Sequence, residues 1–205
     1  MAALAARQSN KLKVSAPFII ALRGVLFLAL FMFNNEVVLR DANEGDLESI
    51  LSIYNDVIIN TTAVYSEKPH TLQMRGDWFK DRINDNFPVF VANIGGRVVG
   101  FSSFGHFRAW PCYRYTVEVS VYVDAAYRGK GISKMLMQSL IDRAKEMNIH
   151  AVIAGINADN LISVNLHRSF GFEEVANFKE VGYKFGRWLD LKFFELMLDC
   201  SPGTT

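Results

Sequence analysis

Two hydrophobic periods alternate along most of this chain and divide it into expected helices and strands. Apolar residues that recur every three or four positions predict amphipathic helices, whereas strict alternation or a short continuous apolar run predicts a strand. Residues 116–123 show the strictest alternation, with a valine at every second position. The expected helices cover residues 47–58, 72–83, 131–147 and 161–169, and the expected strands cover residues 37–40, 88–94, 98–104, 116–123, 151–156, 172–181 and 188–198.

Local signals at the ends of these elements agree with the division. Thr71 can cap the helix that follows it, and Gly171 follows the last helix, as a C-terminal glycine often does. Gly95-Gly96 joins two β-rich runs and indicates a hairpin. Because strands and helices alternate without linkers or repeats, we expect one α/β or α+β domain over residues 37–198, followed by a tail, residues 199–205.

Residues 1–36 follow a different pattern. Residues 18–33 are almost wholly apolar, interrupted by Arg23 and Gly24, and basic residues precede them, which is the layout of a signal or anchor segment. The uninterrupted apolar run, residues 25–33, is far shorter than the roughly 20 residues that cross a bilayer. Three interpretations stay open: a disordered extension or a true start at Met32, a membrane anchor, and an additional packed helix. The short run favours the first, so we do not expect a membrane partner.

Composition and charge narrow the function classes. The chain has 205 residues, 50% of them hydrophobic, which suffices for one core of ordinary size. With 22 basic and 21 acidic residues it lacks the basic excess that nucleic-acid binding requires. Cys112 and Cys200 lack the spacing of a disulfide framework or a zinc site, and no two of the four histidines form an H-x-x-x-H pair. We therefore expect no nucleic acid, no metal and a reducing, cytoplasmic compartment.

The sharpest local feature is a basic, glycine-containing loop, residues 128–133, between the alternating strand and the long helix. A helix begins with backbone N–H groups that lack internal acceptors, and the helix dipole makes this end positive. Gly129 and Gly131 would let a diphosphate approach that backbone, Arg128 and Lys130 add charge, and Ser133 can add a hydroxyl. Such a loop can also cap a helix without any ligand, and its spacing is neither that of a Walker P-loop nor that of a Rossmann loop.

Two neighbouring segments favour a ligand-binding loop, because together with the loop they resemble the GNAT acetyltransferase superfamily. The family's signature [RQ]-x-x-G-x-[GA] is matched at Arg128 and Gly131, with Ser133 in place of glycine or alanine. Residues 157–172, NADNLISVNLHRSFGF, are similar to the family's second acetyl-CoA segment, with Asn160 at the position that contacts the cofactor. The resemblance implies acetyl-CoA bound by Val121, Tyr122, Val123, Arg128, Gly129, Lys130, Gly131, Ile132, Ser133 and Asn160.

The resemblance also implies the fold. GNAT proteins are α+β proteins with a mostly antiparallel, twisted mixed sheet, here of about seven strands flanked by about four helices. The cofactor lies in a cleft where two strands splay.

Three further segments narrow the resemblance. Residues 113–123, residues 181–191, and Tyr54-Asn55 followed by residues 60–63 look like the phosphinothricin N-acetyltransferase subfamily, which includes enzymes acting on methionine sulfoximine and methionine sulfone. The subfamily implies acetylation of the α-amino group of a small amino-acid analogue, a role in antibiotic or herbicide resistance, and a homodimer.

Acetyl transfer to an amine requires a base, a path to the thioester carbonyl, and stabilisation of the oxyanion and thiolate. Neither cysteine has a convincing nucleophile context, so we expect direct transfer in a ternary complex. Glu118 shares a strand face with Thr116 and Ser120, where alternation alone fits a solvent-exposed glutamate equally well. The subfamily has its catalytic base at this position. His167 matches the subfamily's histidine on the helix after Asn160, where acid, second base and hydrogen-bonding roles stay open.

Candidate acceptor residues follow from the anionic groups of such substrates. Arg108 and Arg114 match subfamily arginines and can bind a carboxylate or a sulfone-like oxygen, and Thr116, Thr62 and Tyr65 are further candidates. Residues 110–112, Trp-Pro-Cys, replace more polar residues of the subfamily and put the particular acceptor in doubt. Rival functions are acetylation of peptide N-termini or polyamines, and a non-catalytic acetyl-CoA sensor.

Overall fold

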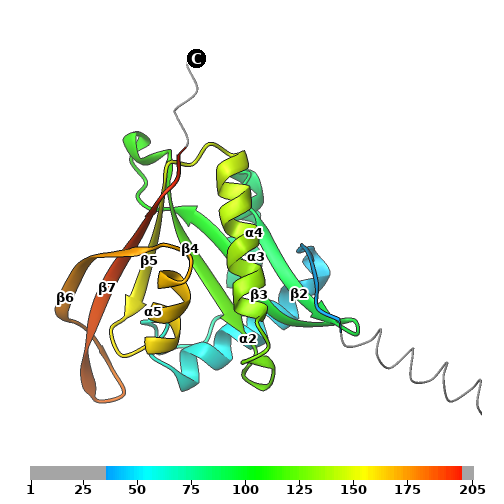
Figure 1. Cartoon of the computed structure of the whole chain (residues 1–205). Coiled ribbons are helices and arrows are strands. Elements are labelled where there is room, and N and C mark those ends of the chain that lie inside the picture. The colour runs from blue at the N-terminus through cyan, green and yellow to red at the C-terminus, as the bar shows by residue number, and fades with distance from the viewer. Residues whose placement is uncertain (1–35, 200–205) are drawn as a thin grey trace, which may run out of the picture. The chain divides into compact units, whose positions relative to one another are not determined.

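The strands expected from the sequence form one seven-stranded sheet with helices on both faces (Figure 1). The computed structural model describes residues 36–199. The strand order is β1-β2-β3-β4-β5-β7-β6. The strands are β1 (Val38–Asp41), β2 (Val89–Ile94), β3 (Arg97–His106), β4 (Thr116–Val123), β5 (Ala151–Asn157), β6 (Glu173–Lys184) and β7 (Arg187–Met197). The α-helices in this part of the chain are α2 (Leu47–Asn60), α3 (Leu72–Asn84), α4 (Ile132–Glu146) and α5 (Leu161–Arg168).

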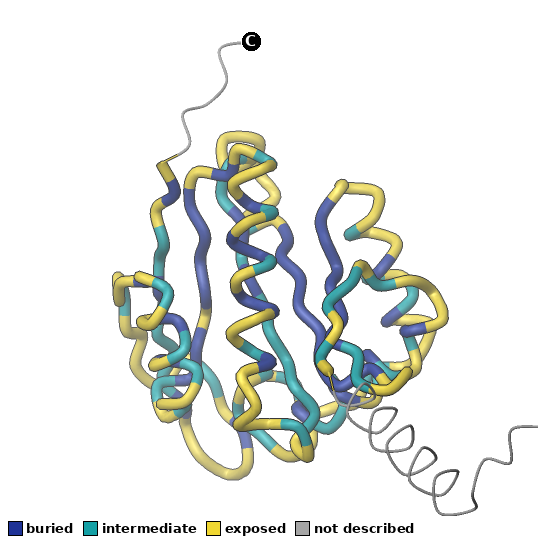
Figure 2. Tube along the Cα trace, turned by 45° about the vertical axis from the view of Figure 1, so that its right-hand side comes forward, coloured by how far each residue is buried: buried dark blue, intermediate teal, exposed yellow. Residues whose placement is uncertain are grey.

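Side-chain alternation on the central strands separates two apolar cores. Val117 and Val119 of β4 pack with Leu136 of α4, and Val164 of α5 belongs to the same core. On the other face, Phe101 of β3 packs in a second core that includes residues of α2 and α3. Figure 2 shows α4 alternating between buried and exposed residues along its length, as expected of an amphipathic helix that covers a sheet.

Helix and turn signals in the sequence have the expected geometry. The Thr71 hydroxyl accepts a hydrogen bond from the Met74 amide and caps α3. Gly95 and Gly96 have positive φ, which is what a two-residue hairpin turn between β2 and β3 requires. Gly171, at φ 87°, ends the segment that follows α5. These local predictions are confirmed.

Within residues 36–199 the strands β4 and β5 form the one parallel pair of the sheet, and their pairing is short. It joins three residue pairs, from Thr116 with Ala151 to Glu118 with Ile153. Beyond that point β4 stays paired with β3 as far as Val123, and β5 stays paired with β7 as far as Asn157. We call the region between residues 119–123 of β4 and residues 154–157 of β5 the β4–β5 opening.

The C-terminal hairpin is longer than the hydrophobic pattern suggested. β6 continues to Lys184 and β7 begins at Arg187, so Phe185 and Gly186 form the turn, both with positive φ. The expected strands had ended at residue 181 and begun at residue 188. Apolar alternation misses these ends because a lysine and an arginine occupy the last and first strand positions.

The interpretations of residues 1–36 and of the tail concern positions that, apart from Glu36 and Asp199, lie outside the described residues. Within residues 36–199 no helix is long and apolar enough to cross a membrane.

Candidate active site

The loop that follows β4 has the backbone geometry of an anion-binding site. Gly129 and Gly131 have φ values of 77° and 78°, and Gly131 is the residue directly before α4. An added Cβ at either glycine would meet no atom within 4 Å, so what glycine supplies here is its positive φ. This conformation directs the chain into the N-terminus of α4, where partial positive charge accumulates.

The backbone amides of this loop are available to a ligand. Among residues 36–199 the amides from Gly129 to Ser133 have no hydrogen-bond acceptor, whereas those of Lys134 and Met135 both bond the Gly131 carbonyl. Arg128 bonds the Val123 carbonyl through Nε at 3.2 Å, which leaves its terminal nitrogens for other partners. The loop can therefore offer several N–H donors and exposed cationic side chains to a phosphate.

The β4–β5 opening leads from this loop to Glu118. In an antiparallel pair such as β3–β4, alternate residues of β4 direct their N–H and C=O groups away from β3. On residues 119–123 these groups face β5, which no longer pairs with them. An extended ligand that carries amides can bond this free backbone. Val121, Tyr122 and Val123 all lie in the stretch, and the Tyr122 ring packs against Phe101 with centroids 5.1 Å apart.

Glu118 stands where the parallel pairing of β4 and β5 ends. Its side chain crosses toward β5, where a Cβ added to Gly155 would lie 3.2 Å from Oε1. Gly155 is the exposed residue of an otherwise buried strand. Burial raises the pKa of the Glu118 carboxyl above its ordinary value, and the positive charge of Arg108 opposes the rise. A carboxylate with a raised pKa is suited to accept a proton near neutral pH.

His167 is a buried residue of α5, 6% exposed, with its ring edge-on to Phe172. Its Nδ1 lies 2.8 Å from the Ser163 carbonyl oxygen. Because a carbonyl only accepts, Nδ1 carries the proton and Nε2 of the neutral ring has a free lone pair. Burial lowers the pKa of His167, and the Ser163 bond partly offsets this. The neutral ring is thus favoured, able to accept a proton at Nε2 rather than to donate one.

Two asparagines follow β5 and have different partners. Asn160, expected to contact the cofactor, accepts from the Ser163 amide through its side-chain oxygen and caps α5. Its amide nitrogen has no such bond among residues 36–199. Asn157 is 2% exposed and donates through Nδ2 to the Tyr65 hydroxyl at 3.0 Å. Tyr65 is thereby fixed beside the end of β5.

The remaining acceptor candidates are only partly brought together. Arg108 lies within electrostatic range of Glu118 and stacks over Phe107 at 4.2 Å. Arg114 instead donates to the Pro111 carbonyl at 3.3 Å and lies over the Tyr115 ring. Thr116 shares the face of Glu118 and is half-buried, as is Thr62 in the loop after α2.

The sequence pattern did not predict the contacts of several residues in this region. They are Gly155 beneath Glu118, Asn157 bonded to Tyr65, Lys184 bonded to the loop after α2, and Arg82, whose guanidinium lies over Gly105, the β3 partner of Glu118. Each contact joins elements distant in the chain. The one usable signal was the placement of Lys184 inside the segment that marks the subfamily.

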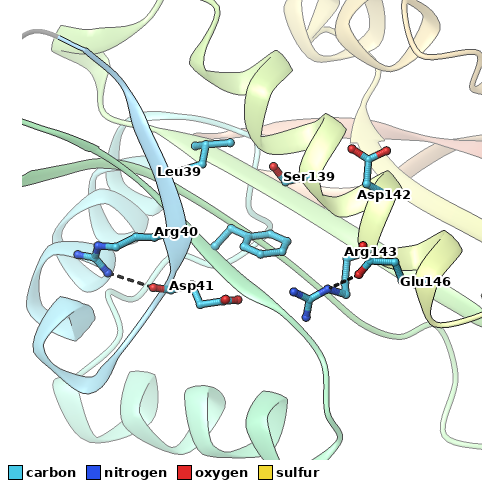
Figure 3. Close-up of a pocket in the computed structure, with 8 residues that line it drawn as sticks. Leu39, Arg40, Asp41, Ser139, Asp142, Arg143 and Glu146 are labelled. Atoms are coloured by element: carbon cyan, nitrogen blue, oxygen red, sulfur yellow. Dashed lines mark hydrogen bonds and ion pairs between the residues drawn. The ribbon is translucent and has the colours of Figure 1, made fainter.

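A groove of about 320 Å³ lies elsewhere, between β1 and α4 (Figure 3). Its arginines are already paired: Arg40 with Asp46 at 2.7 Å, and Arg143 with Glu146 at 3.1 Å. None of the predicted site residues lines it. Within residues 36–199 no group of three or more histidine, cysteine, aspartate or glutamate side chains is placed to hold a metal ion.

Comparisons with known proteins show which family this chain is similar to. The model of the acetyltransferase (GNAT) family matches residues 50–172. An L-methionine sulfoximine/L-methionine sulfone acetyltransferase of Pseudomonas aeruginosa is 46% identical over 162 residues, 78% of this chain and 94% of that protein. A phosphinothricin acetyltransferase from Sinorhizobium meliloti, solved with acetyl-CoA, has a TM-score of 0.78 at 34% identity and covers 82% of this chain and 94% of its own.

A structure named as a ribosomal-protein-alanine N-acetyltransferase from Brucella melitensis has a TM-score of 0.77 at 47% identity, over 78% of this chain and 99% of its own. The mixed sheet with one parallel pair and the helices on both faces are the fold that the resemblance implied. The motif-based resemblance to acetyltransferases of amino-acid analogues is confirmed by the relatives' names. The chain belongs to the acetyltransferase (GNAT) family.

Proposed function

We propose that the protein transfers the acetyl group of acetyl-CoA to the α-amino group of a small amino-acid analogue: methionine sulfoximine, methionine sulfone or phosphinothricin. The observation that carries this proposal is the place of Glu118. A half-buried carboxylate with a raised pKa stands where the β4–β5 opening begins, and the same strand leads into the glycine loop. Donor site and base are thus joined by one strand. The relatives named for these acceptors support the substrate class.

The donor would lie along the β4–β5 opening. Amides from Gly129 to Ser133, with Arg128 and Lys130, bind its diphosphate. The free backbone of residues 121–123 bonds the amides of the pantetheine arm, and the amide nitrogen of Asn160 contacts the cofactor from the start of α5. This arrangement brings the thioester to the Glu118 end of the opening.

Transfer then proceeds directly between the two substrates. Glu118, alone or through a water, removes a proton from the acceptor ammonium. The neutral amine attacks the thioester carbonyl carbon, a C–N bond forms, and the C–S bond breaks as the tetrahedral intermediate collapses. The CoA thiolate leaves and takes up a proton. His167, neutral with Nε2 free, can accept a proton or orient a reacting group by hydrogen bonding.

The acceptor would be held by cationic and hydroxyl side chains. Arg108, near Glu118, is placed for the carboxylate next to the reacting amine, and Arg114 serves a more distant oxygen. Thr116 lies on the same face of β4 as Glu118, and Thr62 and Tyr65 would contribute from the loop after α2, where Tyr65 is bonded to Asn157. The positive charges of Arg108 and Arg114 disfavour polyamines as acceptors.

The experiment that tests this function measures CoA release from acetyl-CoA with each of the three analogues, alongside an alanine-initiated peptide and a polyamine. We expect turnover with at least one analogue and none with the polyamine. Activity confined to the peptide would overturn the proposal in favour of peptide N-terminal acetylation, which the name of the Brucella structure favours. No CoA release with any amine would point to a non-catalytic sensor.

We further propose that the protein is a homodimer in the cytoplasm. Exposed apolar side chains gather on the C-terminal hairpin, and Trp188 is 59% exposed there. Burial of these side chains against a second copy would remove apolar surface from water. Light scattering should give twice the chain mass, and Trp188→Lys should shift the protein toward a monomer. The exposed apolar residues of the hairpin are Val175, Phe178, Val181, Tyr183, Phe185 and Trp188.

For the cytoplasmic location, a free, exposed Cys112 is compatible with a reducing compartment.

A further inference from the structure

Lys184, the last residue of β6, is buried although it carries an ammonium group. Only 2% of the residue is exposed. Its Nζ donates to three carbonyl oxygens: Ile58 at 2.6 Å, Thr61 at 2.8 Å and Val64 at 2.8 Å. An ammonium has three N–H donors, so these contacts satisfy all of its protons.

The three carbonyls belong to the end of α2 and the loop after it. Ile58 lies in the last turn of α2 and Thr61 is its C-terminal cap residue. Carbonyls at a helix C-terminus lack internal donors, and the helix dipole favours a cation there. No carboxylate in the described part of the chain forms an ion pair with Lys184. The ammonium charge of Lys184 therefore interacts with backbone carbonyls. A buried cation of this kind strongly restrains the carbonyls that solvate it.

The restrained loop carries Thr62 and Tyr65, two of the residues proposed to contact the acceptor. The Tyr65 hydroxyl donates to the Asp190 carbonyl at 2.9 Å and accepts from Asn157. The Tyr65 ring covers Gly182, where an added Cβ would lie 2.5 Å from ring carbons. Residues 61–65, which we call the acceptor segment, are thus attached to the hairpin at Lys184 and Gly182, and to β5 at Asn157.

We infer that Lys184 is a positioning residue for the acceptor: by binding the Ile58, Thr61 and Val64 carbonyls it holds the acceptor segment against the C-terminal hairpin, and with it Thr62 and Tyr65. This inference rests on the proposed acceptor function of that segment. It also gives a reason for a lysine inside an exposed hairpin, because methionine would fill the same space without donating a proton.

The first test compares Lys184→Met with Lys192→Met. Lys192 lies in the same hairpin and pairs with Glu174 at 2.9 Å, and within residues 36–199 it forms no hydrogen bond or ion pair with the acceptor segment. With Lys184→Met, the acceptor KM should rise roughly tenfold, the loss typical of removing charged hydrogen bonds. The acetyl-CoA KM should stay within about twofold, as expected when only acceptor binding is affected. Lys192→Met should change neither. A folded Lys184→Met protein with an unchanged acceptor KM would overturn the inference.

A second arm covers the case in which Lys184→Met does not fold. Gly182→Ala displaces the Tyr65 ring and leaves Lys184 in place, so it should also raise the acceptor KM selectively. Where Lys184→Met and Tyr65→Phe each fold as single variants, their effects on the acceptor KM should be non-additive in the double variant, since both residues act through one segment. A Gly182→Ala protein with wild-type acceptor KM, or strictly additive effects, would contradict the role.

A readout without turnover separates this inference from the proposed function. In Lys184→Met, or in Gly182→Ala, hydrogen exchange at the amides of residues 61–66 should speed up, with no change in Lys192→Met. If the wild-type protein acetylates none of the amines, the proposed function fails, and the exchange data still decide whether Lys184 holds the segment. Unchanged exchange in a folded variant would sink the positioning role.

Discussion

The proposed donor side and the proposed acceptor side of this site are built in different ways. The donor side is nearly contiguous: β4, the glycine loop and the start of α4 follow one another within residues 116–133. The acceptor side gathers side chains from the loop after α2, from β4, from β5 and from the C-terminal hairpin. Local backbone conformation determines the first, whereas long-range packing determines the second.

This difference means that the two sides should fail separately. A change in the glycine loop should weaken only acetyl-CoA binding, and a change around Glu118 should affect only proton transfer or acceptor binding.

Replacement of Glu118 by glutamine should have the largest effect. Glutamine keeps the size of the side chain but cannot take a proton, so kcat/KM should fall about a thousandfold, within the range for general-base catalysis. Acetyl-CoA binding, measured by calorimetry, should change by less than about twofold, because it depends on the loop. Retention of most of the activity would show that another group or water alone serves as the base.

His167 should come next. His167→Asn can retain a donor to the Ser163 carbonyl while it removes Nε2, and kcat should fall about a hundredfold if Nε2 handles a proton. His167→Ala additionally leaves a cavity and should lower the melting temperature. Unchanged turnover in both variants would remove His167 from the chemistry.

On the donor side, Gly131→Ala should raise the acetyl-CoA KM roughly tenfold, since a positive φ costs a non-glycine residue about 1–2 kcal/mol and the loop will relax away from it. The acceptor KM should not change. Gly96→Ala is the matched control: Gly96 has φ 87°, and an added Cβ there would also meet no atom within 4 Å. Gly96→Ala should introduce the same backbone strain without changing the acetyl-CoA KM. Equal KM changes in both variants would show that backbone strain at any position weakens acetyl-CoA binding.

The smallest effect concerns pH. The pKa of Glu118 is raised by burial and lowered by Arg108, so Arg108→Gln should raise it further. Because the deprotonated carboxylate is the active form in the proposed mechanism, the acidic limb of the kcat/KM profile should move to higher pH. Arg114→Gln should leave that limb in place, since Arg114 does not contribute to the pKa shift of Glu118. A shift to lower pH in Arg108→Gln would contradict the electrostatic role.

Sequence reasoning succeeded where structure depends on neighbours along the chain. The alternation of residues 116–123 gave β4 with its correct ends, and it placed Glu118 opposite the valines of the α4-side core. The glycines of the loop have the positive φ that a helix N-terminus of this kind needs. Thr71 capped the expected helix.

The rest depended on contacts that no local pattern encodes. Lys184 looked like a polar hairpin residue, yet it binds carbonyls more than 100 residues earlier in the chain. Gly155 interrupts an apolar strand, and only the fold shows that a Cβ at this position would lie 3.2 Å from Oε1 of Glu118. Arg108 and Arg114 were both candidates for binding the acceptor, and only the fold separates the one near Glu118 from the one bonded to its own loop.

The short β4–β5 pairing has one more consequence. It leaves the sheet as two subsheets, β1 to β4 on one side and β5, β7 and β6 on the other, joined edge to edge through three residue pairs. A donor bonded to both facing edges would act as an additional strand and cross-link the subsheets. Saturation with CoA should therefore raise the melting temperature in proportion to the logarithm of its concentration. It should also slow amide exchange in residues 119–123, so that the substrate completes the cooperative unit that catalyses its reaction.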